Sequence, residues 1–140
     1  MRPMRSSSGA APWIVIGLAA GLIIGTAKAQ DGGITVTNLD RLLRQHPLPP
    51  GTTSDIVAER AAGDSKLQVV VETKIPLHVH ADTDHMLYIA RGKGIAHLAG
   101  QMRKIKPGDI LFIPHGIEHG FEKDPLSGNI VMLVVETSGH

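Results

Sequence analysis

The feature that most constrains the fold of this chain is a series of short β-type segments separated by turn residues, from residue 67 almost to the C-terminus. Valine and isoleucine dominate several segments, and the breaks between them contain Gly, Pro and Asp, as in Gly92-Lys93-Gly94. Many short strands at close, even spacing predict an all-β sandwich or small barrel. The predicted strands are Leu67–Thr73, Leu77–His80, Met86–Arg91, Ile95–Ala99, Met102–Ile105, Ile110–Ile113, Glu118–Phe121 and Ile130–Thr137.

Residues 30–66 show no strong period and are expected to form an N-terminal extension. Within it, Asn38 or Thr37 is placed to cap a short helix over Leu39–Gln45, because either side chain accepts hydrogen bonds from a helix N-terminus. Residues 55–60 fit an edge strand or a helical turn, and we favour the strand.

Residues 1–29 have the order of a secretory signal peptide. Arg2 and Arg5 precede an uncharged, mostly apolar run over residues 13–26, and small residues follow it, so cleavage is expected after Ala29. An uncleaved membrane anchor is the alternative, but as a helix this run reaches only about 21 Å, against a hydrocarbon core of about 30 Å. We expect a periplasmic or secreted protein with no membrane attachment after cleavage.

Composition excludes several classes of function. The chain of 140 residues contains no cysteine, which excludes disulfides, thiolate metal sites and thiol nucleophiles. Removal of residues 1–29 takes away three basic side chains and no acidic ones, so the formal charge falls from +1 to −2. A slightly acidic domain with few aromatic residues lacks the basic, aromatic surface that nucleic acids need, and no nucleic-acid partner is expected.

Histidine is the abundant residue with chemical capability, at eight copies. His78 and His80 are two residues apart on a predicted strand, so their side chains share one face. His85 follows across the turn at residues 82–84, and His119 comes soon after Pro114-His115-Gly116. On a strand, the His-x-His spacing suits chelation of one metal ion.

These residues resemble the two motifs of the cupin superfamily. The first motif reads here as His78-x-His80-x4-His85-x6-Gly92, and the second as Gly108-x5-Pro114-x-Gly116-x2-His119. The intermotif spacing of 15 residues is typical of small single-domain bacterial members of the cupin type-2 kind. The sequence departs from the family at Glu72 and Lys123, where the motifs have Gly and Asn.

The resemblance implies a double-stranded β-helix, or jelly-roll barrel, over residues 67–140, preceded by the short N-terminal helix and extension. It also implies one divalent metal ion held by His78, His80, His85 and His119, with iron or zinc favoured and manganese, nickel or copper as alternatives. His85 stands where the family usually has a glutamate, and Asp84 is a rival carboxylate. Four neutral imidazoles would leave the charge of the metal uncompensated.

Two functions follow from the resemblance. The first is a metal-dependent enzyme acting on a small molecule, as a dioxygenase or as an isomerase, lyase or cyclase. The second is a non-catalytic periplasmic module that binds or senses a metal or small ligand. Ionisable groups close to the metal would favour catalysis. No catalytic acid or base is identifiable, and a homodimer formed through residues 31–66 is a further expectation.

Two other side chains near the motifs are expected to have no part in the chemistry. Tyr88 lies three residues beyond His85, on the opposite strand face, and is expected to pack between the sheets. His115 is expected at an exposed loop position.

Overall fold

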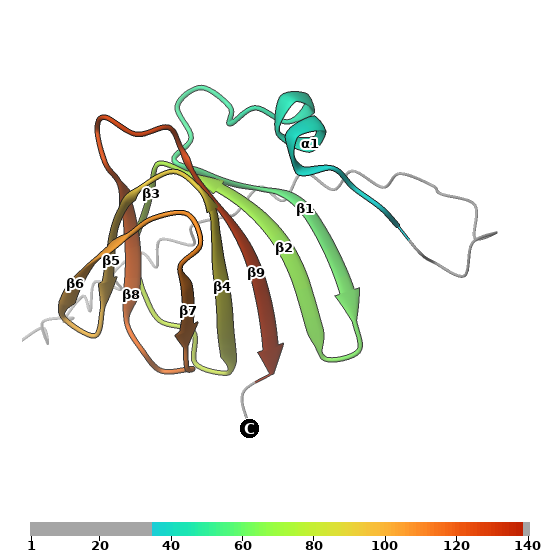
Figure 1. Cartoon of the computed structure of the whole chain (residues 1–140). Helices are drawn as coiled ribbons and strands as arrows, with labels where there is room; N and C mark the ends of the chain where they lie inside the picture. Colours follow the sequence, from blue (N-terminus) through green and yellow to red (C-terminus); the bar gives the residue numbers. More distant parts are fainter. Residues whose placement is uncertain (1–34, 139–140) are drawn as a thin grey trace, which may run out of the picture.

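The computed structural model describes residues 35–138, and in this part of the chain one helix is followed by nine strands (Figure 1). The expected signal peptide at residues 1–29 lies outside the described residues. The elements are α1 (Leu39–Gln45), β1 (Ser54–Ala62), β2 (Ser65–Glu72), β3 (Lys74–His78), β4 (Thr83–Arg91), β5 (Gly94–Leu98), β6 (Gln101–Ile105), β7 (Ile110–Ile113), β8 (His119–Lys123) and β9 (Ile130–Ser138).

The strands form two antiparallel sheets. The larger sheet has the order β1-β2-β9-β4-β7, and the smaller has the order β3-β8-β5-β6. The last strand, β9, lies between β2 and β4 in the larger sheet, so the C-terminal segment joins two earlier parts of the chain (Figure 1). This arrangement confirms the predicted all-β, jelly-roll class with a short N-terminal helix.

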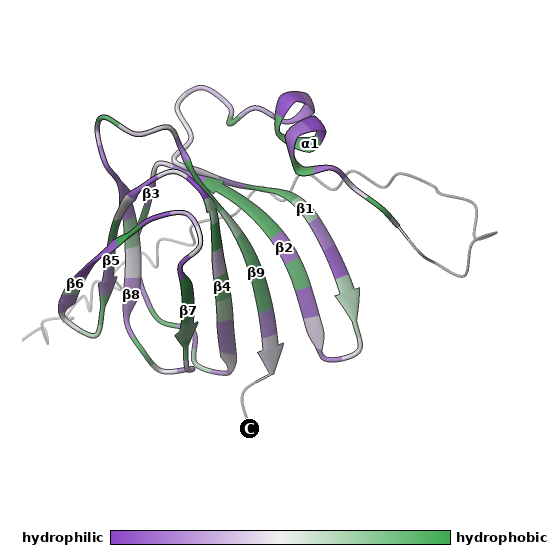
Figure 2. Ribbon diagram, in the orientation of Figure 1, coloured by the Kyte–Doolittle hydropathy of each residue, from purple (hydrophilic) through white to green (hydrophobic). Residues whose placement is uncertain are grey.

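The core lies between the two sheets and follows from strand alternation. On β9, Ile130, Met132 and Val134 are buried and face inward, and on β4 Leu87 and Ile89 do the same. Hydrophobic stretches run along β9 and β4 in Figure 2. Phe121 on β8 contributes from the smaller sheet, together with Ala96 and Ile105, so both sheets close one apolar interior.

Helix α1 packs on the outer side of the larger sheet. Asn38 caps the helix by accepting a hydrogen bond from the backbone N–H of Arg41 at 3.0 Å. The apolar side of the helix, with Leu42 and Leu43, contacts a second buried cluster formed by Val57, Val71 and Val131. An ion pair between Asp40 and Arg91 joins the helix to β4. Among the described residues, no helix has the length and apolar character to cross a membrane.

The predicted elements agree with the structure at most positions. Helix Leu39–Gln45 and strand Ile110–Ile113 have the predicted bounds. The segment expected as an extension contains β1, which pairs with β2 from Ser54 to Ala62 and is thus part of the larger sheet. Tyr88 is 43% exposed on the outer face of β4, so the expectation that it packs between the sheets was wrong.

Candidate metal centre

Four histidines converge at one end of the barrel. His78 is the last residue of β3 and His119 is the first residue of β8, and the two are cross-strand partners. Their ring centroids lie 4.3 Å apart. The pairing of two distant strands therefore brings together histidines that are 41 positions apart in the sequence.

His80 and His85 complete the group. His80 lies just beyond the end of β3, so the two motif histidines are not on one regular strand as predicted. The ring of His80 is nevertheless 4.8 Å from that of His78 and 4.3 Å from that of His85. His85 is buried near the start of β4, and its ring lies 5.6 Å from that of His119. All four sequence-predicted residues are thus brought together.

Three of the four histidines offer nitrogen atoms that lie within 4.8 Å of one another, namely His78, His80 and His119. Two nitrogen ligands of one ion, each at about 2.1 Å, lie at most about 4.2 Å apart. If two of these nitrogens lie at the full 4.8 Å, they must move about half an ångström closer together to bind one ion. The donor set therefore fits a first-row transition metal.

Backbone contacts orient two of these rings. His78 donates its Nδ1–H to the carbonyl oxygen of Pro76 at 2.9 Å, and His119 donates its Nδ1–H to that of Ile117 at 2.8 Å. Because a carbonyl oxygen only accepts, each ring has its proton on Nδ1 and a lone pair on Nε2. This is the tautomer and the outer hydrogen bond that metal-ligating histidines use.

His85 has a different neighbour. Its Nε2 lies 3.3 Å from Oε1 of Glu136, its cross-strand partner on β9. The atom is buried, and by geometric criteria it has no hydrogen-bond partner among the described residues. His85 is outside the group of three mutually close ligand atoms. A buried, unsatisfied ring nitrogen beside three other histidines, two of them oriented by backbone contacts, is what a missing bond partner, such as a metal ion, would leave.

Glu136 was missed in the sequence analysis. The sequence signal for Glu136 is its place in the strand alternation. It continues the inward-facing positions Ile130, Met132 and Val134 of the predicted strand at residues 130–137. A glutamate that continues the buried face of an apolar strand is a candidate for a functional group. Its proximity to His85 depends on the β4–β9 pairing, which connects residues 51 positions apart.

The other candidate carboxylate points elsewhere. Asp84 accepts hydrogen bonds from both the backbone N–H and the ring Nδ1 of His115, at 2.7 and 2.8 Å. His115 is exposed, as expected for this loop. Since Asp84 and His85 are consecutive on β4, their side chains lie on opposite faces of the sheet. Glu136 contacts the histidine group through His85.

The electrostatics favour neutral histidines beside an ionised carboxylate. Burial lowers the pKa of His119 to about 4, and it also lowers the pKa of His80. A proton on His85 Nε2, facing Glu136, holds the pKa of that carboxyl below its usual range, although burial opposes this effect. A metal ion bound at Nε2 would displace this proton. At neutral pH the rings of His80 and His119 are therefore neutral, and Glu136 carries one negative charge beside the group.

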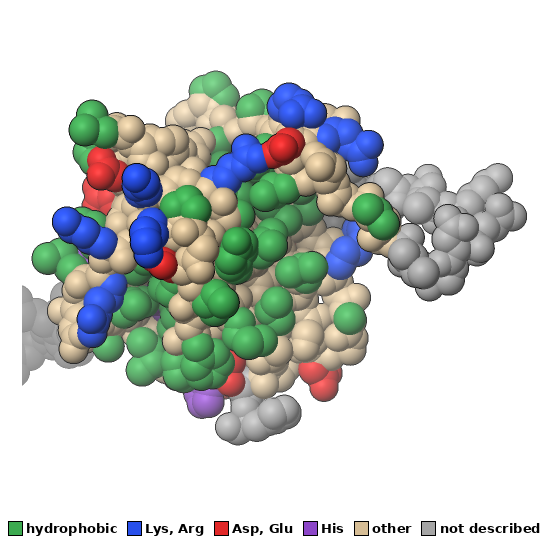
Figure 3. All heavy atoms as spheres, in the orientation of Figure 1, with side chains coloured by type: hydrophobic (Ala, Val, Ile, Leu, Met, Phe, Trp, Pro, Cys, Tyr) green, Lys and Arg blue, Asp and Glu red, His purple; other side chains and the backbone are tan. Residues whose placement is uncertain are grey.

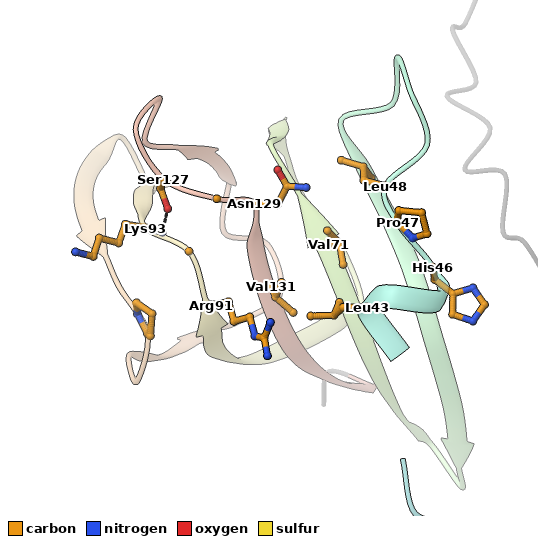
Figure 4. A pocket seen from close by; sticks show the side chains of 13 residues that line it. Leu43, His46, Pro47, Leu48, Val71, Arg91, Lys93, Ser127, Asn129 and Val131 are labelled. Carbon is orange, nitrogen blue, oxygen red and sulfur yellow. Dashed lines mark hydrogen bonds between the residues drawn. The ribbon is translucent and has the colours of Figure 1, made fainter. Parts of the chain in front are cut away.

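A separate groove of about 750 Å³ lies away from the histidines (Figure 4). Leu43 and Pro47 form one side, Arg91 and Lys93 the other, and Val131 is part of its floor. Val131 and Glu136 are five residues apart on β9, which corresponds to about 16 Å along a strand. The groove therefore belongs to the helix-covered end of the sheet and not to the candidate metal centre.

Comparison with known proteins gives three findings of similarity. An uncharacterized protein of Aquifex aeolicus (strain VF5) is 38% identical over 55 residues, covering 39% of this chain and 46% of that relative, so the match spans less than half of its length. An uncharacterized conserved protein with a double-stranded β-helix domain from Klebsiella pneumoniae has a TM-score of 0.64 at 19% identity, covering 79% of this chain and 89% of that one. KdgF from a Halomonas species has a TM-score of 0.50 at 26% identity, covering 66% and 85%.

The family comparison is the more decisive. The profile of the family described as Cupin domain matches residues 67–136, which is half of the chain and includes all four histidines together with Glu136. The Klebsiella pneumoniae structure, with its double-stranded β-helix domain, shows a similar fold. This protein belongs to the Cupin domain family.

Proposed function

We propose that this protein is a metal-dependent enzyme that acts on a small, oxygen-containing molecule. The observation that carries the proposal is the group of three histidine nitrogens within 4.8 Å of one another, with two of the rings locked in the metal-binding tautomer. Cupin structures with such clusters suit a divalent ion and a small ligand. A bound transition metal would supply Lewis acidity, or redox chemistry if it is iron, copper or manganese.

His78, His80 and His119 would hold the ion, with His85 as the fourth ligand. The buried Nε2 of His85 supports this assignment, because it lies beside the group without a hydrogen-bond partner among the described residues. Glu136 changes the charge argument made from four histidines alone. Its carboxylate places one negative charge at the site, so the charge of the ion would be partly compensated without direct ligation by this residue.

Glu136 is also the group that favours catalysis over simple binding. An ionised carboxylate next to the ligands can accept a proton from a substrate or hold the His85 ring in position. Lys66, whose Nζ lies 3.8 Å from Oε2 of Glu136, places a positive charge behind it. A binding module needs neither charge. The reaction classes compatible with this site are dioxygenation and isomerase, lyase or cyclase chemistry.

The test is a substrate screen with the metal-loaded protein. Samples loaded separately with Fe²⁺, Mn²⁺ or Zn²⁺ are mixed with diketones, phenols and small organic acids, and dioxygen uptake and substrate loss are recorded. Glu136→Gln should retain the metal and lose about 100-fold or more in turnover. His119→Ala should lose both, whereas Glu122→Gln, an exposed glutamate on β8, should change neither.

Two outcomes count against the enzyme. Metal bound tightly with no turnover of any compound would favour the non-catalytic binding or sensing module. Full turnover by Glu136→Gln would show that Glu136 takes no part in the reaction.

We also propose that the protein works outside the cytoplasm, in the periplasm or after secretion. The order of basic, apolar and small residues over positions 1–29 supports export.

A further inference from the structure

The groove at the helix-covered end of the larger sheet has cationic side chains and no acidic ones among the described residues that line it. Arg91 and Lys93 are the charged members of the lining. Ser127, Asn129 and His46 add polar groups, and the remaining residues are apolar or glycine. The groove volume of about 750 Å³ is within the range of pockets that bind small molecules. The lining therefore suits a ligand that combines a negative charge with an apolar body.

The floor of the groove runs across three strands. Arg91, the last residue of β4, is the cross-strand partner of Val131 on β9, and Val131 is the partner of Val71 on β2. Cross-strand partners have their side chains on the same face of a sheet, so the three lie in one row. Because neighbouring strands are about 4.8 Å apart, the row is roughly 10 Å long. Leu43 of α1 packs beside Val131 and forms a wall over this floor (Figure 4).

Arg91 supplies the anchoring charge. Its Nη2 forms an ion pair with Oδ1 of Asp40 on α1. A guanidinium has five N–H donors in a planar fork, so the pair with Asp40 leaves donors for the carboxylate of a ligand. The side chain of Arg91 is 47% exposed, so a ligand can reach these donors from solvent.

Further basic side chains surround the groove. Lys93 has no ion pair among the described residues, and Arg44 lies in the last turn of α1. Asp124 lines a smaller hollow beside Lys93, but its carboxylate accepts a hydrogen bond from the backbone N–H of Leu126. Figure 3 shows Lys and Arg side chains around this end of the molecule. The local field therefore attracts anions.

We propose that this groove binds one small carboxylate with an apolar chain of about eight carbon atoms. The carboxylate pairs with Arg91, and the chain lies over Val131 against Leu43 and Leu48, which are only half-buried. With C–C bonds of about 1.5 Å and bond angles of about 111°, eight carbons extend roughly 9 Å, which matches the length of the floor.

This site is separate from the candidate metal centre. Val131 on the floor and Glu136 beside the histidines are about 16 Å apart along β9. The proposal therefore does not rest on metal binding or on turnover. Since carboxylates also bind metal ions, its test must distinguish the groove from the histidine group.

Isothermal titration calorimetry with octanoate tests the proposal on protein purified from its native compartment. Octanoate should saturate one site per chain with a Kd of about 0.1–1 mM, as expected for a ligand of this size. Acetate has the charge without the chain, and 1-octanol has the chain without the charge. Each should bind at least about 10-fold more weakly than octanoate.

Two variants separate the charge of Arg91 from the docking of α1. Arg91→Gln should weaken octanoate binding by about 10-fold or more, because it removes the guanidinium. Asp40→Asn breaks the same ion pair but keeps the guanidinium, so it should bind octanoate as tightly as the parent or more tightly. Arg103→Gln, an exposed arginine on β6 of the other sheet, is the matched control and should change nothing.

The His78→Ala, His119→Ala double variant should bind octanoate as the parent does. Loss of binding in this variant would place octanoate at the metal centre and overturn the proposal. It is also overturned by the absence of saturation up to about 10 mM octanoate, or by 1-octanol binding as tightly as octanoate. Full binding by Arg91→Gln, or an equal loss in Asp40→Asn and Arg91→Gln, would remove Arg91 as the anchor and contradict the proposal.

Discussion

Glu72 is a carboxyl group fully buried at the opposite end of the barrel from the histidines. It is 0% exposed, and neither oxygen has a hydrogen-bond partner among the described residues. It shares the inward face of β2 with Val70 and pairs with the core residue Ile130. Burial raises the pKa of Glu72 to about 8, so the folded protein holds this side chain protonated at neutral pH.

The raised pKa of Glu72 predicts a pH-dependent loss of stability. Between pH 4.5 and about 8 the folded state keeps a proton that the unfolded state releases, so this group lowers the free energy of unfolding as pH rises. The expected slope is about 1.4 kcal/mol per pH unit. Glu72→Gln cannot ionise, and its stability relative to the parent should rise by that amount per unit.

Urea unfolding of parent and variant at several pH values between 5 and about 8 measures this difference, in which the other titrating groups cancel. Glu122→Gln, an exposed glutamate, serves as the control and should show no such slope. Parallel stability curves for Glu72→Gln and the parent would show that Glu72 ionises normally.

Histidines and carboxylates differ in how well the sequence predicts them. The four histidines were recognisable because two motifs with defined spacing carry them. Glu136 and Glu72 each occur in an apolar strand, and their burial follows from alternation. The residues that contact these carboxylates cannot be predicted from alternation. The partner of Glu136 is set by the pairing between β4 and β9, and the periodicity of one segment carries no information about its partner strand.

At the scale of elements, the turn between β4 and β5 packs closely against the backbone that precedes β9. Gly92 has a φ of +76°, and a Cβ there would lie 2.4 Å from the carbonyl oxygen of Asn129. Gly100, between β5 and β6, has nearly the same φ of +77°, but a Cβ there would meet nothing within 4 Å. A comparison of the two glycines therefore distinguishes the effect of the left-handed backbone conformation from the effect of close packing.

Alanine substitutions at the two glycines should differ in their effect. Gly100→Ala should cost about 1 kcal/mol, from the left-handed conformation alone. Gly92→Ala should lower the free energy of unfolding by the same amount and by a further 1–3 kcal/mol or so, because the β8–β9 connection must move. Chemical denaturation of both variants measures the difference. Equal losses would mean that the contact between Gly92 and Asn129 relaxes freely.

Element boundaries were predictable where turn residues mark them. Gly, Pro and Asp bracket β7, and its bounds were correct. Strand β1 was ambiguous because it is an edge strand with little burial, so alternation is weak in its sequence. Strand β3 ends at His78, two residues earlier than predicted, and a register irregularity between Ile75 and His78 accompanies it. Such irregularities depend on pairing with β8 and not on local sequence.

For the whole molecule, the order of the strands was available only through the family resemblance. The insertion of β9 between β2 and β4 leaves no local signal, although it closes the core and brings Glu136 to the site. The outward position of Tyr88 also depends on the arrangement of the whole molecule. Alternation divides the side chains of a strand between two faces, but it does not say which face packs against the other sheet.

Export is a prediction about the whole chain. Mass spectrometry of the protein from its native compartment should give a chain that starts at Gln30 or close to it, because the small residues before it suit signal cleavage. The exported chain should be recovered from the soluble fraction. A full-length mass in the membrane fraction would favour the uncleaved anchor.

The central claim is that the histidine group holds one metal ion, and elemental analysis tests it most directly. Protein purified from its native compartment should contain about one first-row transition metal per chain, whereas a His78→Ala, His119→Ala double variant should contain almost none. His46→Ala, outside the group, should retain the ion. Equal metal content in the double variant and the parent, with both folded, would contradict the assignment of the site.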